Sequence, residues 1–295
     1  MNDKKGVSVR KIFGDVFGIV FSRDLQKIYW PLCVISGFNW VLAVVSRFFF
    51  EGTGGSNLGK EIIFTIWWII LLILGSWMFL FELKIVCEGI DKKDVSWREA
   101  VTFANKNLLR SIGMGMILFL LGMLLMIIFG IMSAAIGLGL SMVSAKLGVI
   151  ISGLLVFMGI ICIIYVGVRL VLAPYHIFIG DRPVITGMVE SWQASRERFW
   201  LIVRLVLSVL VCSVLVSLIV YGMGAVVGVL LSLLHKVIGV LVGGIIYVGF
   251  QPFILCFTIG TVYLLYKNLM VEEEIGEEEG SGNSGATEST EFGQS

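Results

Sequence analysis

Six stretches of the chain carry no charged side chain and are long enough to cross a lipid bilayer. They cover residues 28–46, 62–81, 111–145, 147–168, 205–235 and 237–266. About 20 apolar residues in a helix span the hydrocarbon core. Because that core holds no water, a crossing segment must satisfy its backbone hydrogen bonds internally, and only helices and closed barrels do so. The pattern therefore predicts an all-α polytopic membrane protein with six transmembrane helices.

The composition agrees with this class. Hydrophobic residues make up 58% of the chain and charged residues 15%, whereas soluble domains carry about 25% charged residues.

The run at 111–145 is longer than one crossing needs, and we interpret it as one long helix with a glycine-rich extension. The sequence leaves open whether residues 130–145 are helix or loop. Residues 1–27 lack the apolar core of a signal peptide, so we expect the first span to act as an uncleaved insertion signal.

A basic amphipathic segment precedes each pair of runs. In residues 9–21 the apolar side chains recur every three or four positions, which places them on one helical face. Such a helix with basic flanks lies in the membrane interface; the alternative is a helix packed on the protein's own core. In residues 88–110, Ser96 and Glu99 form a capping box. A third amphipathic helix, with Thr186 as its candidate cap, leads into the span that begins at Phe199.

The same order, an amphipathic helix followed by two spans, occurs three times. The repeat units cover about residues 8–87, 88–174 and 175–271. A shift of 90 positions aligns Asp91 with Asp181, whereas the first unit aligns less well. Two spans per unit give all units the same orientation, and repeats in membrane proteins often place a site at their interface. Chance similarity among basic amphipathic helices is the alternative interpretation.

Residues 272–295 differ from the rest of the chain. They hold acidic residues among Gly, Ser, Thr and Asn, with Ile275 and Phe292 as the large apolar side chains. Such a segment cannot bury an apolar core, so we expect a disordered acidic tail. The chain thus divides into a six-helix membrane domain over residues 1–271 and this tail.

Lysine and arginine are distributed unequally between the two sides that six spans define. One side, which holds both termini, carries eighteen of them, and the other carries Arg47, Lys60, Lys146 and Lys236. Segments rich in Lys and Arg stay in the cytoplasm. The asymmetry therefore predicts cytoplasmic termini and cytoplasmic amphipathic helices, whose basic side chains would meet anionic lipid headgroups.

Short motifs near the fourth, fifth and sixth spans resemble a bacterial pattern. They are Leu172-Ala173-Pro174, the turn Gly180-Asp181-Arg182-Pro183, Ser191-Trp192, Arg198-Phe199-Trp200, and Tyr263, Tyr266, Lys267, Asn268 and Leu269. The pattern is similar to that of glycerophosphoryl diester phosphodiesterase membrane-domain-like proteins and related uncharacterised multi-pass families. Asn268 and Met270 stand where those proteins carry an acidic-basic pair. The resemblance implies a six-helix membrane domain of unknown activity. Some members add a catalytic barrel, for which we expect no room here, so their enzymatic activity is not implied.

Polar and ionisable side chains within or near spans are the candidate functional positions, because charge in a bilayer is costly. Those at span ends anchor a helix at the interface or pair with other helices, the alternative being substrate contact. Pro252 leaves the carbonyl of Val248 without its helical donor, which gives a packing kink or, alternatively, a gating hinge or substrate site. The cluster Gly239, Gly243 and Gly244 predicts close helix packing. The candidate positions are Asn39, Glu82, Lys84, Arg169, Pro174, Arg204, Gln251 and Pro252.

No motif predicts catalysis, a metal or a cofactor. The chain has no Ser-His-Asp set, no HExxH motif, no phosphate-binding loop and no basic stripe for nucleic acid. His176 and His235 fall on opposite sides of the predicted topology, so we do not expect them to share a site. The five cysteines stand singly in apolar segments and are interpreted as packing residues.

The leading interpretation is a non-enzymatic integral protein of the bacterial inner membrane, acting in envelope or lipid homeostasis or as a membrane scaffold. A transporter or channel for a small molecule or lipid is the first alternative; the repeat and Gln251-Pro252 favour it, and the lack of buried charges along a pathway opposes it. An intramembrane lipid-modifying enzyme is the second alternative. Membrane lipids with anionic headgroups are the expected partners, and no feature indicates a protein partner.

The predicted orientation is testable by labelling. In a chain whose native cysteines are replaced, Ser56→Cys and Ser232→Cys should react with a membrane-impermeant maleimide added to intact cells, because both lie on the side poor in basic residues. Ser96→Cys and Ser284→Cys should react only after permeabilisation. Labelling of either of these two in intact cells would overturn the orientation.

Overall fold

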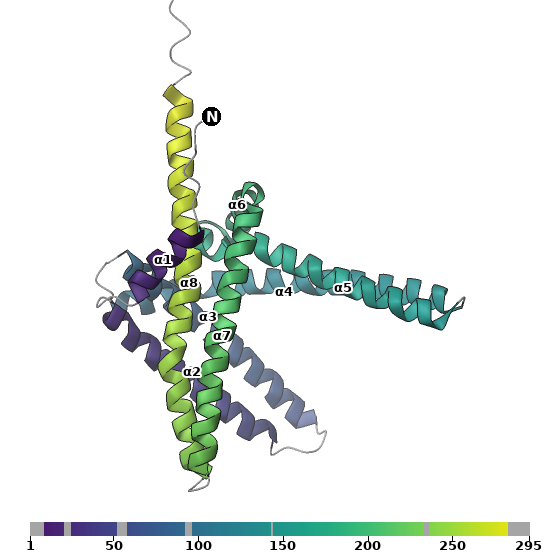
Figure 1. Cartoon of the computed structure of the whole chain (residues 1–295), viewed down its shortest axis with the longest axis horizontal. Helices are drawn as coiled ribbons and strands as arrows, with labels where there is room; N and C mark the ends of the chain where they lie inside the picture. The colour runs from purple at the N-terminus through teal and green to yellow at the C-terminus, as the bar shows by residue number, and fades with distance from the viewer. Residues whose placement is uncertain are drawn as a thin grey trace, which may run out of the picture.

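The computed structural model is built of helices (Figure 1) and describes residues 9–20, 25–51, 58–91, 96–142, 144–232 and 236–282. No strand occurs in these ranges. The helices are α1 (Val9–Val20), α2 (Leu25–Glu51), α3 (Leu58–Ile90), α4 (Trp97–Ser141), α5 (Ala145–Arg169), the short π-helix η1 (Tyr175–Ile179), α6 (Val184–Glu197), α7 (Phe199–Ser232) and α8 (Lys236–Gly282).

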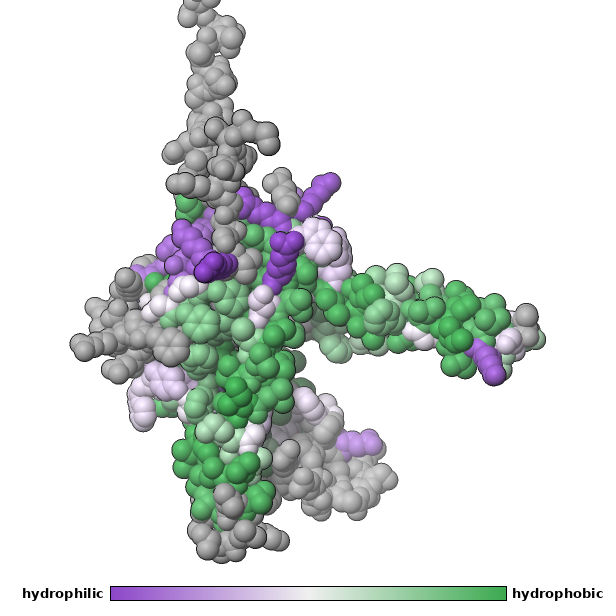
Figure 2. All heavy atoms as spheres, viewed as in Figure 1, coloured by the Kyte–Doolittle hydropathy of each residue, from purple (hydrophilic) through white to green (hydrophobic). Residues whose placement is uncertain are grey.

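Six of these helices are long and apolar enough to cross a membrane. The apolar segments are Ile28–Ser46, Glu61–Ile90, Trp97–Ser141, Ala145–Arg169, Phe199–Val227 and Val242–Val271. Large apolar side chains cover their outer faces, as Figure 2 shows for the hairpins α4/α5 and α7/α8. The all-α polytopic class is thereby confirmed. The glycine-rich part of the third run is also helical up to Ser141, so it is not a loop.

Three helix boundaries differ from those expected. Helix α4 joins the amphipathic segment and the third span in one helix, with Ser96 at the N-cap accepting a hydrogen bond from the Glu99 amide at 3.4 Å. Helix α6 begins at Val184, so its N-cap is Pro183 rather than Thr186. Helix α8 continues to Gly282, beyond the expected start of the tail, because glutamate is a good helix former. Residues 283–295 lie outside the described residues.

The buried core gathers at one end of the molecule. Hydrophilic side chains gather at this end (Figure 2), which we term the polar end. Its ion pairs include Arg110 with Asp181, Arg182 with Glu190 and Lys267 with Asp91. The hairpins α4/α5 and α7/α8 diverge from it (Figure 1). Its core includes fully buried side chains from several helices, namely Leu32 of α2, Leu80, Phe81, Leu83 and Ile85 of α3, Ala100 and Ala104 of α4, Leu172 and Ile177 of the α5–α6 connection, Ile202 and Leu205 of α7, and Leu265 of α8.

Small residues hold the hairpins together along their length. In α4/α5, the Ser133 hydroxyl donates to the Ser152 carbonyl at 3.2 Å and the Ser152 hydroxyl donates to the Ser133 carbonyl at 3.1 Å. A Cβ atom on Gly148 would lie 2.8 Å from the Gly137 carbonyl oxygen, so the two backbones touch there. Helices α7 and α8 also pair closely, whereas α2 packs mainly on α8 and α3 mainly on α4. The first unit therefore does not form a closed hairpin like the other two.

Helix α1 packs its apolar stripe on the protein. Ile12 and Val16 are buried, and the Phe13 ring lies edge-on to Phe257 of α8 with centroids 5.4 Å apart. Of the two interpretations of residues 9–21, the structure therefore favours packing on the protein's own core. Arg10 and Lys11 remain exposed on the outer side of the helix. The side chains of Arg23, Lys27, Arg47, Lys60 and Lys236 lie outside the described part.

The glycine contacts in α4/α5 predict unequal effects of two alanine substitutions in one helix. Gly148→Ala places a methyl group against backbone atoms of α4 and should lower the free energy of unfolding by about 1–3 kcal/mol. Gly153→Ala meets nothing within 4 Å and should change it by less than about 1 kcal/mol. Thermal unfolding in detergent measures both. Equal melting temperatures for the two variants would contradict the packing described.

Candidate functional site

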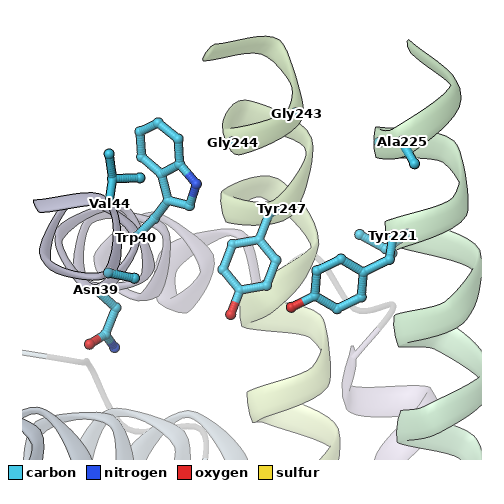
Figure 3. A pocket seen from close by; sticks show the side chains of 11 residues that line it. Asn39, Trp40, Val44, Tyr221, Ala225, Gly243, Gly244 and Tyr247 are labelled. Atoms are coloured by element: carbon cyan, nitrogen blue, oxygen red, sulfur yellow. The ribbon is translucent and has the colours of Figure 1, made fainter. Parts of the chain in front are cut away.

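A cavity of 490 Å³ lies between α2, α7 and α8 (Figure 3). Its volume falls in the range of about 300–1,000 Å³ that ligand pockets occupy. The phenol groups of Tyr221 and Tyr247 point into the same space, with ring centroids 5.7 Å apart. The lining consists of Asn39, Trp40, Ala43, Val44, Val220, Tyr221, Gly224, Ala225, Gly243, Gly244 and Tyr247.

Glycines in the cavity lining allow the surrounding helices to pack closely. A Cβ atom on Gly244 would lie 2.3 Å from the Trp40 ring, so the indole packs directly on the α8 backbone. Gly224 and Gly243 face each other across α7 and α8, each Cβ position within 4.0 Å of the other's carbonyl oxygen. The expectation of close packing at Gly243 and Gly244 is therefore confirmed, while the side-chain position of Gly239 lies outside the described residues.

A second, smaller cavity follows along the same pair of helices. It has a volume of 190 Å³ and an apolar lining formed by Phe17, Cys212, Ser213, Leu215, Val216, Phe253, Ile254 and Phe257. The predicted positions Gln251 and Pro252 lie on α8 between the two cavities and line neither of them. Beside them, the Tyr29 hydroxyl of α2 donates to the Gly249 carbonyl.

The polar end contains a buried cluster of tyrosines. Tyr175, Tyr263 and Tyr266 stack with centroid distances between 5.9 and 6.4 Å. The Tyr175 hydroxyl donates to the Ile259 carbonyl at 2.9 Å, and burial raises the pKa of Tyr175 well above its ordinary value. The Tyr263 hydroxyl donates to Asp91 at 2.9 Å. This cluster joins α3, the α5–α6 connection and α8.

His176 is buried beside the tyrosines and contacts a carboxylate. Its Nδ1 atom lies 3.3 Å from Glu190 of α6, and Arg182 approaches the same carboxylate at 3.5 Å. Its ring is edge-on to Tyr266 at 4.9 Å. Burial lowers the pKa of His176 and Arg182 lowers it further, while Glu190 acts in the opposite direction. Nearby, a hydrogen bond from Arg110 holds the pKa of Asp181 below its ordinary value.

Arg169 lies at the end of α5 within a group of aromatic rings. Its guanidinium carbon is 5.2 Å from the Tyr165 ring centroid, 5.4 Å from Trp192 and 5.1 Å from Phe199. The Tyr165 hydroxyl accepts two hydrogen bonds from it, at 2.9 and 3.1 Å. These rings come from three successive helices, so the group forms only when α5, α6 and α7 pack together.

The other candidate positions have separate surroundings. Lys84 pairs with Glu88 at 2.9 Å and lies over the Phe103 ring, which fits the anchoring interpretation. Glu82 is buried near the polar end, Pro174 precedes η1, and Arg204 is exposed on α7. The structure thus brings Glu82, Lys84, Arg169 and Pro174 to the polar end, and it places Asn39 in the distant cavity.

The sequence marks Tyr263 and Tyr266 as part of a motif but does not indicate that Tyr175 and His176 join them. The predicted topology places His176 and His235 on opposite sides of the membrane, and His235 lies outside the described residues. The recurrence of tyrosine at 263 and 266, three positions apart, is the one signal that could have marked the cluster. Among the described residues, no three His, Cys, Asp or Glu side chains are close enough to hold a metal ion.

Comparison of the chain with family models, with curated proteins and with solved structures found no match. The resemblance to the phosphodiesterase membrane-domain-like proteins therefore stays a prediction.

The environment of His176 predicts a pH dependence of stability. Because its pKa in the folded protein lies below the ordinary value of 6.5, the unfolded chain binds the proton more readily as the pH falls through this region. The stabilising contribution is complete above pH 6.5 and is lost below it. The melting temperature of the wild type should fall more than that of His176→Asn between about pH 8 and about pH 5.5. Parallel curves would show that His176 does not titrate in this way.

Proposed function

We propose that the protein is a non-enzymatic, lipid-binding protein of the bacterial cytoplasmic membrane that acts in envelope or lipid homeostasis. The cavity between α2, α7 and α8 is the observation that carries this proposal. It lies within the membrane-spanning segments, and the exposed residues Asn39, Tyr221 and Ala225 in its lining open it to the surrounding bilayer.

The chemistry of the cavity suits an amphipathic ligand. Val44, Val220 and Ala43 supply apolar wall, while Asn39 and the two tyrosines supply an amide and two hydroxyls. Sites for such ligands combine mostly apolar walls with a few polar groups that fix orientation. A lipid that entered sideways would keep its acyl chains in an apolar environment and present its polar part to these side chains.

The cavity lining argues against chemistry at this position. Among the described residues of its lining there is no serine, cysteine, histidine or carboxylate, which are common nucleophiles and bases of enzymes. Binding without reaction is therefore the better interpretation of this cavity.

We further propose that both termini and the polar end face the cytoplasm. The described basic residues Arg110, Arg182 and Lys267 support this orientation, since their ion pairs lie at the polar end. Hydrophilic side chains gather at this end of the molecule (Figure 2). Lys146 sits at the opposite tip of α4/α5. With this orientation the larger cavity opens into the outer leaflet.

A transporter is the second candidate, because two cavities lie along the same hairpin. The larger one reaches Tyr247 on α8 and the smaller one begins at Phe253, with Gln251 and Pro252 between them. A proline inside a spanning helix weakens the local hydrogen-bond ladder. If the intervening segment opens, the two cavities form one path for an apolar or amphipathic substrate.

Filling the cavity tests the lipid-binding proposal. Ala225→Phe places a ring in the cavity, whereas Val226→Phe places the same ring on the neighbouring residue, which is 62% exposed and does not line the cavity. Native mass spectrometry of the purified protein should show a retained lipid in the wild type and in Val226→Phe, and its loss in Ala225→Phe. Equal lipid retention in the two variants would contradict the proposal, and loss of a small polar molecule instead would favour transport.

A further inference from the structure

Arg169 is the buried cation at the polar end for which the structure shows no counter-ion. Its side chain is 8% exposed. Four other cations of the polar end have carboxylate partners: Lys84 pairs with Glu88, Arg110 with Asp181, Arg182 with Glu190 and Lys267 with Asp91. No carboxylate of the described residues lies within ion-pair distance of Arg169. A buried charge is costly unless it is paired and hydrogen-bonded.

The donors of its guanidinium are only partly used. Nε and Nη2 donate to the Tyr165 hydroxyl. Nη1 is buried and has no hydrogen-bond partner in the described structure. The three rings stabilise the positive charge through their faces, but a ring face does not replace an acceptor in the plane of the guanidinium. The guanidinium of Arg169 can bind two acceptor oxygens side by side, and its Nη1 atom is without an acceptor among the described residues.

The surrounding residues hold this group in place. The hydroxyls of Ser191 and Ser195 donate to the carbonyl oxygen of Arg169 at 2.9 and 3.2 Å, and both serines are fully buried. These two hydrogen bonds connect α6 to the end of α5, and this contact places the Trp192 ring next to the guanidinium of Arg169. The Ser191-Trp192 motif therefore serves to build the surroundings of Arg169. We refer to Arg169, Tyr165, Trp192 and Phe199 as the arginine box.

The outer wall of the arginine box carries exposed aromatic side chains of the kind that favour the depth of lipid headgroups. Tyr165 and Trp192 are 39% and 38% exposed, and Trp200 beside them is 71% exposed. Tryptophan and tyrosine prefer the membrane–water interface. Below the box, α5 and α7 diverge (Figure 1) and present apolar side chains such as Ile161 and Leu207, which are 43% and 59% exposed. A ligand at the box would thus have charge at its upper part and apolar helix faces beneath.

We propose that the arginine box binds the phosphate of an anionic glycerophospholipid from the leaflet at the polar end. Nη1 of Arg169 donates to a phosphate oxygen once the Trp192 ring has rotated aside, and the acyl chains run between the diverging faces of α5 and α7. Arginine suits this ligand because its planar fork matches the spacing of phosphate oxygens. This site is separate from the cavity between α2, α7 and α8. The proposal of a phosphate site at the arginine box can therefore be tested independently of the function proposed above.

The test compares lipids and variants with the full-length protein in mixed micelles. Phosphatidylglycerol, phosphatidylcholine and inorganic phosphate are titrated while thermal unfolding is followed, and native mass spectrometry counts the bound lipids. Phosphatidylglycerol should raise the melting temperature of the wild type more than phosphatidylcholine does, with one lipid retained most tightly. Arg169→Lys keeps the charge but loses the fork, so it should weaken phosphatidylglycerol binding about tenfold.

Arg204→Lys is the matched control, since it makes the same exchange at an exposed arginine of α7 that is no part of the box. It should change the affinity for phosphatidylglycerol by less than about twofold. Equal weakening by Arg204→Lys and Arg169→Lys would overturn the proposal, because the loss would then not depend on the arginine box. Equal protection by phosphatidylcholine, or no effect of Arg169→Lys, would also overturn it. If inorganic phosphate raises the melting temperature as much as phosphatidylglycerol does, the ligand of the box is a soluble anion and the proposal of a lipid ligand is overturned.

If Arg169→Lys fails to fold, the comparison of the three ligands with the wild-type protein still tests whether the protein prefers phosphatidylglycerol. The variant Ala225→Phe distinguishes this proposal from the function proposed above: it should lose the lipid of the larger cavity and keep the one at the arginine box. Loss of both lipids in Ala225→Phe would show that a single site accounts for them and would overturn the box as a separate site.

Discussion

The polar end depends on the burial of the connection between α5 and α6. Leu172, Ala173 and Ile177 of this connection are at most 1% exposed, although connections usually lie at the surface. Inside a bilayer, helices gain little from apolar contact with one another because lipid is equally apolar. Contacts outside the hydrocarbon region therefore carry more weight, and here they converge on this connection. The Tyr175 hydroxyl and the two serines on the Arg169 carbonyl supply its polar partners.

Close approaches and one positive φ angle in the backbone of this connection explain why glycine and aspartate occur at certain positions in and after it. Gly180 lies close to the His176 carbonyl oxygen, which a Cβ atom would approach to 2.7 Å, and Gly187 lies against Ile177. Asp181 has a positive φ of 49°, a conformation that aspartate tolerates better than most residues. Its carboxylate also pairs with Arg110 of α4. The turn motif noticed in the sequence thus shapes the route by which the chain leaves the core.

The sequence predicted the features that depend on local periodicity. The six spans, the cap at Ser96 and the close approach at Gly243 and Gly244 follow from residues near one another in the chain. The tyrosine cluster did not follow, because its contacts join residues as far apart as Tyr175 and Ile259. The arginine box did not follow either, because the sequence motifs that contain Arg169, Trp192 and Phe199 do not show that three helices bring these side chains together. Periodicity shows which face of a helix is apolar but not which partner covers it. For the same reason it left open whether the α1 stripe met lipid or protein.

The divergence of the hairpins has a mechanical consequence. Beyond Ser111, α4 extends by about 45 Å at about 1.5 Å per residue, and its pair α5 is joined to the rest of the molecule at one end. A rotation of the α4/α5 hairpin about its attachment at the polar end therefore moves its far tip most. A rotation of about 10° displaces this tip by about 8 Å at this length. Transmembrane helices are tilted by about 0–40° from the bilayer normal, so a change in the tilt of α4/α5 within this range moves its far tip by several ångströms relative to Arg169 and the connection that follows it.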